Sequence, residues 1–150
     1  MYMAEVRNFK PYIAGMVRFS LLIVDDDEAL LEAIQDTIRL RLPHVSVSTS
    51  PSAQEALRLL SLQSYDVTLS DVRMPSMDGY RLLSQIRNLW PTMPVLLMSG
   101  HLDAMPEGDP KQAGAFAVLN KPLDRDVLIS HLQRALEKTR LIPGEQGRNP

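Results

Sequence analysis

The sequence contains no cysteine, which excludes disulfide bonds and thiolate-ligated metal sites and fits a reducing compartment. It also lacks an excess of either charge: its net charge of −2 gives no indication of a nucleic-acid or anionic-membrane partner. Long apolar runs are missing as well. The apolar stretch over residues 12–17 is far too short to span a bilayer, and the charges of Glu5, Arg7 and Lys10 do not fit a signal peptide. We therefore expect a cytoplasmic protein that has no membrane partner.

The remaining composition is that of an ordinary globular domain. The 150 residues are 45% hydrophobic and 23% charged, which allows one domain with a sizeable core. Residues 1–18 show no clear period and contain a proline and a glycine, so they predict a loosely ordered leader, with Met16 as an alternative start. Residues 19–140 are expected to form the domain, and the Gly- and Pro-containing residues 141–150 a flexible tail.

Strand-like and helix-like segments alternate through the expected domain. Short apolar or alternating runs predict strands over 19–24, 45–50, 66–70, 94–99 and 115–119, and apolar residues at helical spacing predict helices over 28–42, 53–62, 79–89 and 124–140. The predicted buried stripes include Leu30, Ile34 and Ile38 in the first helix and Val127, Leu128, Leu132 and Leu136 in the last. This alternation predicts an α/β fold with a doubly wound, five-stranded parallel sheet and helices on both faces.

Polar and charged residues stand where the predicted strands end. Three aspartates follow the first strand, Asp71 follows the third, Ser99 ends the fourth, and Lys121 follows the fifth. The carboxyl ends of parallel strands are where such folds gather functional residues. If the first and third strands are neighbours, Asp25, Asp26 and Asp71 converge and repel one another. A hard divalent cation would relieve this repulsion, and Mg²⁺ is the usual ion at a partly hydrated carboxylate site.

A hydroxyl group and an ammonium group complete this constellation. Ser99 and Lys121 would flank the acids from the other side of the predicted sheet edge. A carboxylate, a hydroxyl, an ammonium and a divalent ion together can bind the oxygens of a phosphoryl group during in-line transfer. The strand ends therefore predict phosphoryl chemistry.

Four segments carry a specific resemblance to a known family. They read LLIVDDDEAL, YDVTLSDVRMPSMDGYRLL, PVLLMSGH and AFAVLNKPLD, and in this order they resemble the receiver domain of two-component response regulators. The similarity covers about residues 19–140, and the aspartate followed by MP and DG is its most specific part. The resemblance implies a flavodoxin-like sheet with strand order 2-1-3-4-5.

The resemblance also implies roles for the acidic residues. Asp71 would be the phosphoacceptor, a nucleophile that forms an aspartyl phosphate. Asp26 and Asp71 would bind Mg²⁺ directly together with the backbone carbonyl of Arg73, and Asp25 would act mainly through metal-bound water. Asp27 has no ligand role in the family, and its charge suits the start of a helix.

The family pattern gives further roles near the last two strands. Ser99 would hydrogen-bond to the phosphoryl group, Lys121 would pair with one of its oxygens, and the Lys121–Pro122 peptide bond is expected to be cis. Many receivers have a Tyr or Phe three residues before the lysine that turns inward on phosphorylation. Here this residue is Val118, so switching by an aromatic side chain is not available in that form.

Three other residues are candidates for setting the lifetime of the phosphoryl group. Gly100 would leave room beside this group, and Arg73 and His101 stand at variable positions that could guide or block the attacking water. If exchanging both Arg73 and His101 left dephosphorylation unchanged, this hypothesis would be dismissed.

The family's fourth helix should lie within residues 101–115, and this sequence departs from the pattern there. The segment contains Pro106, Gly108 and Pro110. Inside a helix a proline costs about 3 kcal/mol and a glycine about 1 kcal/mol. We expect a short or displaced helix, or one that orders conditionally. Protection of amides 103–112 from hydrogen exchange without phosphorylation would count against this expectation.

The function implied by the resemblance is that of a stand-alone receiver. It would take a phosphoryl group from a histidine kinase or phosphotransfer protein and would not be an enzyme beyond its own phosphorylation and dephosphorylation. The chain itself would not bind DNA. The signal would pass by protein contact to a downstream protein that the sequence does not identify, and a phosphorylation-dependent homodimer is one form that this contact could take.

Three other functions were weighed against this one. A haloacid-dehalogenase-like phosphatase would use Asp25 and Asp27, but Ala29 stands where that family needs a hydroxyl, and no paired acids follow Lys121. A flavodoxin-like cofactor binder needs amides and hydroxyls in its first loop, where three aspartates would repel a phosphate. A receiver fold kept only for partner binding is disfavoured by the complete set of acids, hydroxyl and lysine, and remains open.

Overall fold

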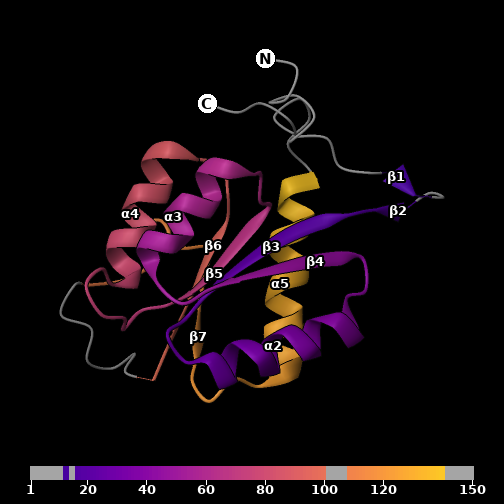
Figure 1. Ribbon diagram of the computed structural model, residues 1–150, viewed down its shortest axis with the longest axis horizontal. Helices are drawn as coiled ribbons and strands as arrows, with labels where there is room; N and C mark the ends of the chain where they lie inside the picture. The colour runs from indigo at the N-terminus through magenta and orange to yellow at the C-terminus, as the bar shows by residue number, and fades with distance from the viewer. Residues whose placement is uncertain (1–11, 14–15, 101–107, 141–150) are drawn as a thin grey trace.

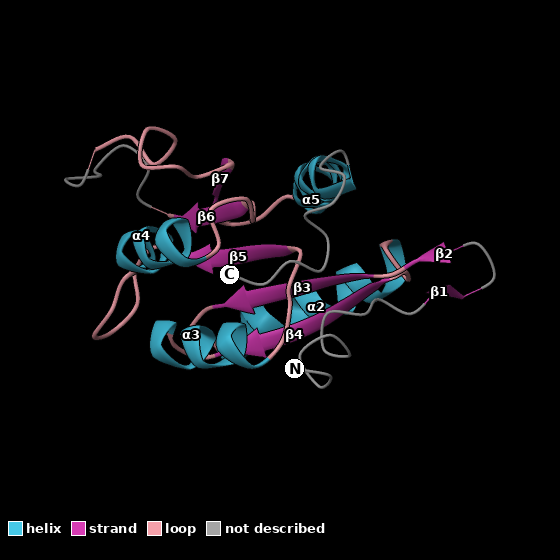
Figure 2. Ribbon diagram, turned by 90° about the horizontal axis from the view of Figure 1, so that it is seen from above, coloured by secondary structure: helices cyan, strands magenta, loops and turns pink. Residues whose placement is uncertain are grey.

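The fold is built around one parallel sheet. The computed structural model describes residues 12–13, 16–100 and 108–140. Its five-stranded sheet has the order β4-β3-β5-β6-β7, and Figure 2 shows the neighbouring strands β4, β3, β5 and β6 running in one direction. The strands are β3 (Phe19–Val24), β4 (Val45–Ser50), β5 (Val67–Asp71), β6 (Val95–Ser99) and β7 (Ala117–Asn120). Counted along this sheet the order is 2-1-3-4-5, which confirms the predicted flavodoxin-like fold.

Four helices cover the two faces of this sheet. They are α2 (Glu28–Arg41), α3 (Ala53–Leu62), α4 (Gly79–Leu89) and α5 (Arg125–Arg140). One apolar cluster joins the sheet to α2 and α5, and a second joins it to α3 and α4, which lie side by side in Figure 1. Alternate residues of β3 enter the two clusters: Leu21 and Ile23 enter the first, and Leu22 and Val24 the second. Burial on both faces explains why this strand is a continuous apolar run.

Polar side chains set where the first three helices begin. Asp27 accepts a hydrogen bond from the Leu30 N–H at 3.1 Å and caps α2, as its place after the strand predicted. Ser52 caps α3 in the same way, and Asp78 caps α4 by accepting from the Arg81 N–H at 2.9 Å. Such caps satisfy N–H groups that have no partner within the helix.

The predicted buried stripes were wrong at two positions. Val127 is 46% exposed, and Ile129 lies in the core instead. In α2, Leu31 is buried, whereas Leu30 is only partly buried and packs at the margin of the cluster. In both helices an apolar residue one or two positions further along the chain is buried instead, because the rotation of a helix is set by packing against the sheet and not by spacing alone. None of the described helices is long and apolar enough to cross a membrane.

The predicted leader and tail lie mostly outside the described residues. Tyr12–Ile13 (β1) and Met16–Val17 (β2) form a small antiparallel pair ahead of β3. Residues 1–11, 14–15 and 141–150 are not described, so the leader, the flexible tail and the start at Met16 stay predictions.

The segment that departs from the family pattern forms a turn where it is described. Residues 101–107 lie outside the description, and residues 108–114 contain no helix. The turn is closed by hydrogen bonds from Ala113 N–H to Asp109 O at 3.2 Å and from Ala115 N–H to Pro110 O at 3.0 Å. Gly108 and Gly114 have φ values of 93° and 105°, which glycine adopts without steric cost. Residues 108–114 therefore form a turn and not a regular helix, and whether a short or conditionally ordered helix forms within residues 101–107 stays a prediction.

Candidate functional site

Three carboxylates meet at the carboxyl end of the sheet. One oxygen each from Asp25, Asp26 and Asp71 lies within 4.8 Å of the others. They converge because β3 and β5 pair in parallel, with Val24 opposite Ser70, so that Asp25 and Asp71 follow adjacent positions. Asp25 is fully buried and Asp71 is 6% exposed, whereas Asp26 is exposed. The predicted acidic cluster is therefore present.

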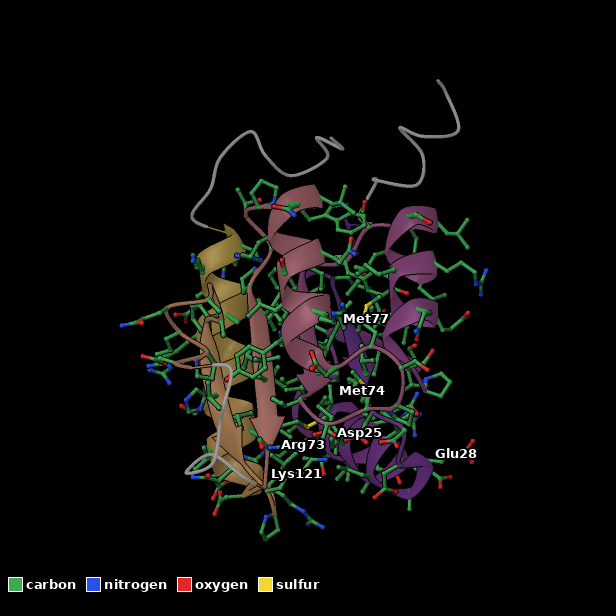
Figure 3. All side chains as sticks on the ribbon, turned by 90° about the vertical axis from the view of Figure 1, so that its left-hand side faces the viewer. Asp25, Glu28, Arg73, Met74, Met77 and Lys121 are labelled. Atoms are coloured by element: carbon green, nitrogen blue, oxygen red, sulfur yellow. The ribbon has the colours of Figure 1, made fainter. Side chains whose placement is uncertain are left out.

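Lys121 lies between the two buried carboxylates. Its Nζ is 2.9 Å from Asp25 Oδ2 and 3.2 Å from Asp71 Oδ1. Figure 3 shows Asp25, Arg73 and Lys121 at this end of the sheet. The Lys121–Pro122 peptide bond is cis, as expected, and Pro122 is exposed. The chain thus supplies one positive charge against three carboxylates.

The electrostatics of the cluster favour a further cation. Burial raises the pKa of the Asp25 carboxyl, and hydrogen bonds from Lys121 and from the Asp27 N–H (2.9 Å to Oδ1) offset only part of this rise. For Lys121, burial lowers the pKa, but the hydrogen bond to Asp25 and the charge of Asp71 outweigh it, so the net effect is to raise the pKa. Negative charge stays in excess although Lys121 is present. An oxygen-only donor set of this charge suits Mg²⁺.

Ser99 ends β6 at the same edge. It is 1% exposed, and its carbonyl accepts a hydrogen bond from the Lys121 N–H at 3.0 Å. In the sheet, Asp71 pairs with Met98 and Ser99 pairs with Asn120, so Ser99 lies between the strand that ends in the acid and the strand that leads to the lysine. The structure therefore brings this predicted hydroxyl to the acidic edge.

The residues predicted to set the phosphoryl lifetime or to take part in switching lie further from the acidic cluster. A Cβ added to Gly100 would meet only the Lys121 Cβ, at 3.9 Å, so there is room beside the glycine. Arg73 is exposed on the loop after β5, and Val118 is partly buried in β7. His101 lies outside the described residues, so its role stays a prediction.

Gly79 holds the loop after β5 against Asp71, and the sequence analysis gave it no physical role. Its N–H donates to the Val72 carbonyl at 2.8 Å. A Cβ at Gly79 would lie 2.4 Å from the Asp71 carbonyl oxygen and 2.9 Å from the Val72 Cα, so no side chain fits. The glycine of the DG pair was part of the resemblance, but the contact that requires it joins residues eight positions apart and appears only in the folded chain.

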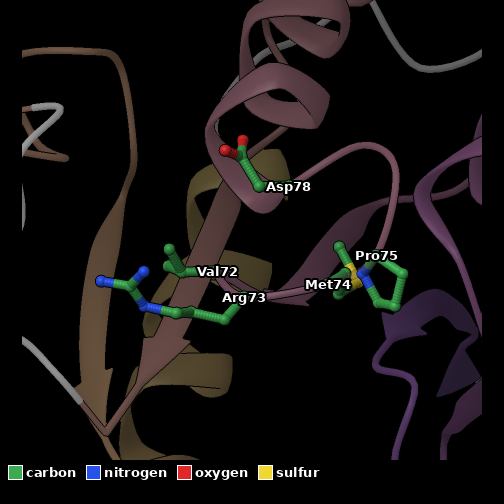
Figure 4. A pocket seen from close by; sticks show the side chains of 5 residues that line it. All are labelled: Val72, Arg73, Met74, Pro75 and Asp78. Atoms are coloured by element: carbon green, nitrogen blue, oxygen red, sulfur yellow. The ribbon is translucent and has the colours of Figure 1, made fainter.

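A pocket of about 330 Å³ opens beside this loop. Its lining residues are Val72, Arg73, Met74, Pro75 and Asp78. Figure 4 shows the Arg73 side chain extending away from Met74 and Pro75. The pocket thus lies along the loop that follows Asp71.

Residues 21–133 match the response regulator receiver domain. The chain belongs to this family. It is 40% identical over 123 residues to the C4-dicarboxylate transport transcriptional regulatory protein DctD of Rhizobium meliloti (strain 1021), a match that covers 82% of the chain and 26% of DctD. It is 37% identical over 128 residues to the transcriptional regulatory protein GlrR of Escherichia coli (strain K12), covering 85% of the chain and 28% of GlrR. The receiver thus spans about a quarter of the length of these relatives.

Solved receiver structures share the fold. The response regulator receiver domain protein from Clostridium thermocellum is 28% identical, with a TM-score of 0.75 over 82% of this chain and 98% of that one. The signal receiver domain of a signal transduction histidine kinase from Syntrophus aciditrophicus is also 28% identical, with a TM-score of 0.74 over 84% of this chain and 96% of that one. The recognised family and the predicted fold are therefore confirmed.

Proposed function

We propose that this receiver accepts a phosphoryl group on Asp71 from a histidine kinase or a phosphotransfer protein, with Mg²⁺ bound at the acidic cluster. The observation that carries the proposal is the placement of Asp71 within one group of side chains that also contains Asp25, Asp26 and Lys121. A carboxylate at the end of a strand, next to an exposed loop, can act as a nucleophile toward a group that enters from outside.

In the transfer step, an Asp71 carboxylate oxygen forms a bond to phosphorus. The P–N bond of the donor phosphohistidine breaks, its electron pair returns to the imidazole nitrogen, and that nitrogen takes a proton from solvent. Lys121 must exchange its 3.2 Å contact with Asp71 for a contact with a phosphoryl oxygen. Its stronger hydrogen bond to Asp25 can keep the ammonium in place meanwhile.

Asp25, Asp26, Asp71 and the backbone carbonyl of Arg73 are the groups that would hold Mg²⁺. The ion would neutralise charge on the phosphoryl oxygens as the donor bond breaks. Ser99, at the adjacent strand end, would donate its hydroxyl to the phosphorylated form.

The same proposal extends to the signal. The receiver acts in the cytoplasm, carries no enzymatic activity beyond its own phosphorylation and dephosphorylation, and passes the signal by protein contact without binding DNA itself. Phosphorylation biases an equilibrium between two conformers, and the downstream partner or a second copy of the chain binds one of them. The departures from the family pattern at Val118 and after Gly100 favour an output surface that differs from the usual one.

The test is intact-mass analysis after incubation with Mg²⁺ and a small acyl phosphate donor. The wild type should gain one phosphoryl group, and this gain should require Mg²⁺. Asp71→Asn should gain none, whereas Asp36→Asn, the same change at an exposed aspartate of α2, should behave like the wild type. If the folded wild type gains nothing with any donor, the chain is not a phosphoacceptor and the partner-binding function becomes the better one.

A further inference from the structure

The turn over residues 108–115, which leads into the edge strand β7, is attached to α4 near both ends of that helix. Near its start, Tyr80 Oη donates a hydrogen bond to the Gly108 carbonyl at 2.8 Å. Near its end, the Arg87 side chain packs against Gly114 so closely that a Cβ there would lie 2.8 Å from the Arg87 Cδ. Tyr80 and Ala115 also belong to the same apolar cluster between the sheet and α4.

The turn over residues 108–115 contains short-range hydrogen bonds of its own. It is closed by these bonds, one of which runs from the Lys111 N–H to Asp109 Oδ1 at 3.0 Å. Its two ends are glycines with positive φ, where the chain can change direction at low cost. The hydrogen bond from Tyr80 is solvent-exposed, so it is worth little and can be exchanged easily.

The start of α4 is in direct contact with Asp71. Tyr80 follows Gly79, whose Cα packs against the Asp71 carbonyl without space for any further atom. A shift of the Asp71–Val72 backbone therefore has to displace the first turn of α4, which carries Tyr80. The other attachment, at Arg87, is about two helical turns away and lies near the carbonyls of Pro91 and Met93, to which its guanidinium donates.

We propose that the Tyr80–Gly108 hydrogen bond is a conformational latch. It holds the turn over residues 108–115 against α4 while Asp71 is unmodified, and it breaks when Asp71 is phosphorylated. This inference rests on the proposed function of Asp71 as the phosphoacceptor. Release frees the turn beside β7, at the edge of the sheet, while Arg87 keeps the C-terminal end of the turn attached. Val118 lacks the aromatic ring that many receivers use to signal in this region. In this chain Tyr80 of α4 would instead link the acidic site to the turn beside the edge strand β7.

The test is hydrogen exchange of amides 111–115, with intact mass recorded on the same samples. Without a phosphodonor, Tyr80→Phe should exchange these amides about 2- to 5-fold faster than the wild type, the effect of losing one exposed hydrogen bond. Tyr65→Phe removes a hydroxyl that accepts a hydrogen bond from the Gln63 side chain, and it should leave amides 111–115 unchanged. With Mg²⁺ and excess donor, the wild type should reach the faster rate, and Tyr80→Phe should show no further increase.

The following results would contradict the proposed role of the Tyr80–Gly108 hydrogen bond. Equal exchange in Tyr80→Phe and the wild type, or an equal acceleration by phosphorylation in both, would overturn the latch. A mass gain without any change in exchange would overturn the latch and leave the proposed function standing. If the wild type gains no phosphoryl group, the proposed function fails, and the coupling to Asp71 fails with it. Asp71→Asn should keep the slow rate in the presence of donor.

Discussion

At the scale of single residues, Lys121 balances only part of the negative charge around it. Asp25 and Asp71 both lie within 3.2 Å of its ammonium, and the pKa of the buried Asp25 is still raised by desolvation. The ionised form of Asp25 is therefore less favourable in the folded protein than in the unfolded chain. In the absence of a divalent ion, this carboxylate destabilises the fold that it serves.

This imbalance predicts how stability depends on pH when a chelator is present. Because the folded pKa of Asp25 lies above its ordinary value of 3.8, the free energy of unfolding should rise as the pH falls from neutral through that raised pKa. Asp25→Asn should be more stable than the wild type at pH 7, and the difference should shrink as the pH falls through the raised pKa of Asp25. Urea denaturation across this range measures both trends, and a lower stability of Asp25→Asn at pH 7 would contradict them.

Gly79 supports a second prediction at this scale. In Gly79→Ala the new Cβ would have to displace the Asp71 or Val72 backbone. Overpacking of this kind typically costs about 1–3 kcal/mol, although alanine favours a helix over glycine by about 1 kcal/mol. We expect a lower urea midpoint and slower phosphorylation from a small donor. Gly100→Ala, where the new Cβ meets only one atom at 3.9 Å, should keep its stability within about 0.5 kcal/mol.

The sequence was sufficient to predict the polar residues of the cluster but not the residue that supports them. Asp25, Asp71, Ser99 and Lys121 each stand at or just after the end of a predicted strand, so knowing that parallel strands end at one edge was enough to bring them together. Gly79 carries no chemistry of its own. Its role depends on how closely α4 approaches the end of β5, and this distance follows from packing that no local pattern encodes.

At the scale of elements, α4 matters to the site because it begins beside Asp71. Its N-cap, Asp78, also lines the pocket next to the loop after β5. Asp78→Ala should reduce the free energy of unfolding by about 1 kcal/mol, the usual worth of an N-cap. Ser52→Ala, which removes the cap of α3, should cost a similar amount.

The two variants should differ in phosphorylation. Loss of the cap in α4 loosens the turn that packs on Asp71, so Asp78→Ala should accept a phosphoryl group more slowly in stopped reactions followed by intact mass. Ser52→Ala should be phosphorylated at the wild-type rate, because Ser52 caps α3 and not the helix whose first turn packs on Asp71. Equal rates in both variants would show that the start of α4 does not position Asp71.

The positions of strands and helices along the chain could be predicted from sequence more reliably than which face of each helix is buried. Short apolar or alternating runs marked all five strands to within two residues, and Asp27 marked the start of α2. The rotation of α5 was wrong at Val127 because an apolar residue beside a stripe can lie inside or outside with similar local preference. For residues 108–114, prolines and glycines indicated a departure from a regular helix, but they do not specify that Tyr80 would contact the resulting turn.

At the scale of the whole molecule, binding of Mg²⁺ should stabilise the fold. An ion that binds only the folded state adds about 2.7 kcal/mol at a concentration one hundred times its Kd. The urea midpoint of the wild type should therefore rise with Mg²⁺ concentration. NaCl at matched ionic strength controls for screening of the carboxylates.

Asp26→Asn provides the matched variant for this measurement. Asp26 is exposed and its replacement leaves the Lys121 contacts in place, so the variant should fold normally and lose most of the Mg²⁺-dependent rise. A full rise in Asp26→Asn would place the ion elsewhere. The alternation of strands and helices predicted a doubly wound parallel sheet, whereas the strand order 2-1-3-4-5 came from the resemblance to receiver domains.

The Lys121–Asp25 hydrogen bond joins residues that are 96 positions apart. During synthesis the ribosome makes the three aspartates early and the lysine late, and a growing chain that ends before residue 121 has its acids without their ammonium. Domains form this kind of long-range contact only once the later strand is available. The contacts of the ammonium with the two buried carboxylates are therefore complete only in chains whose last strand has been made.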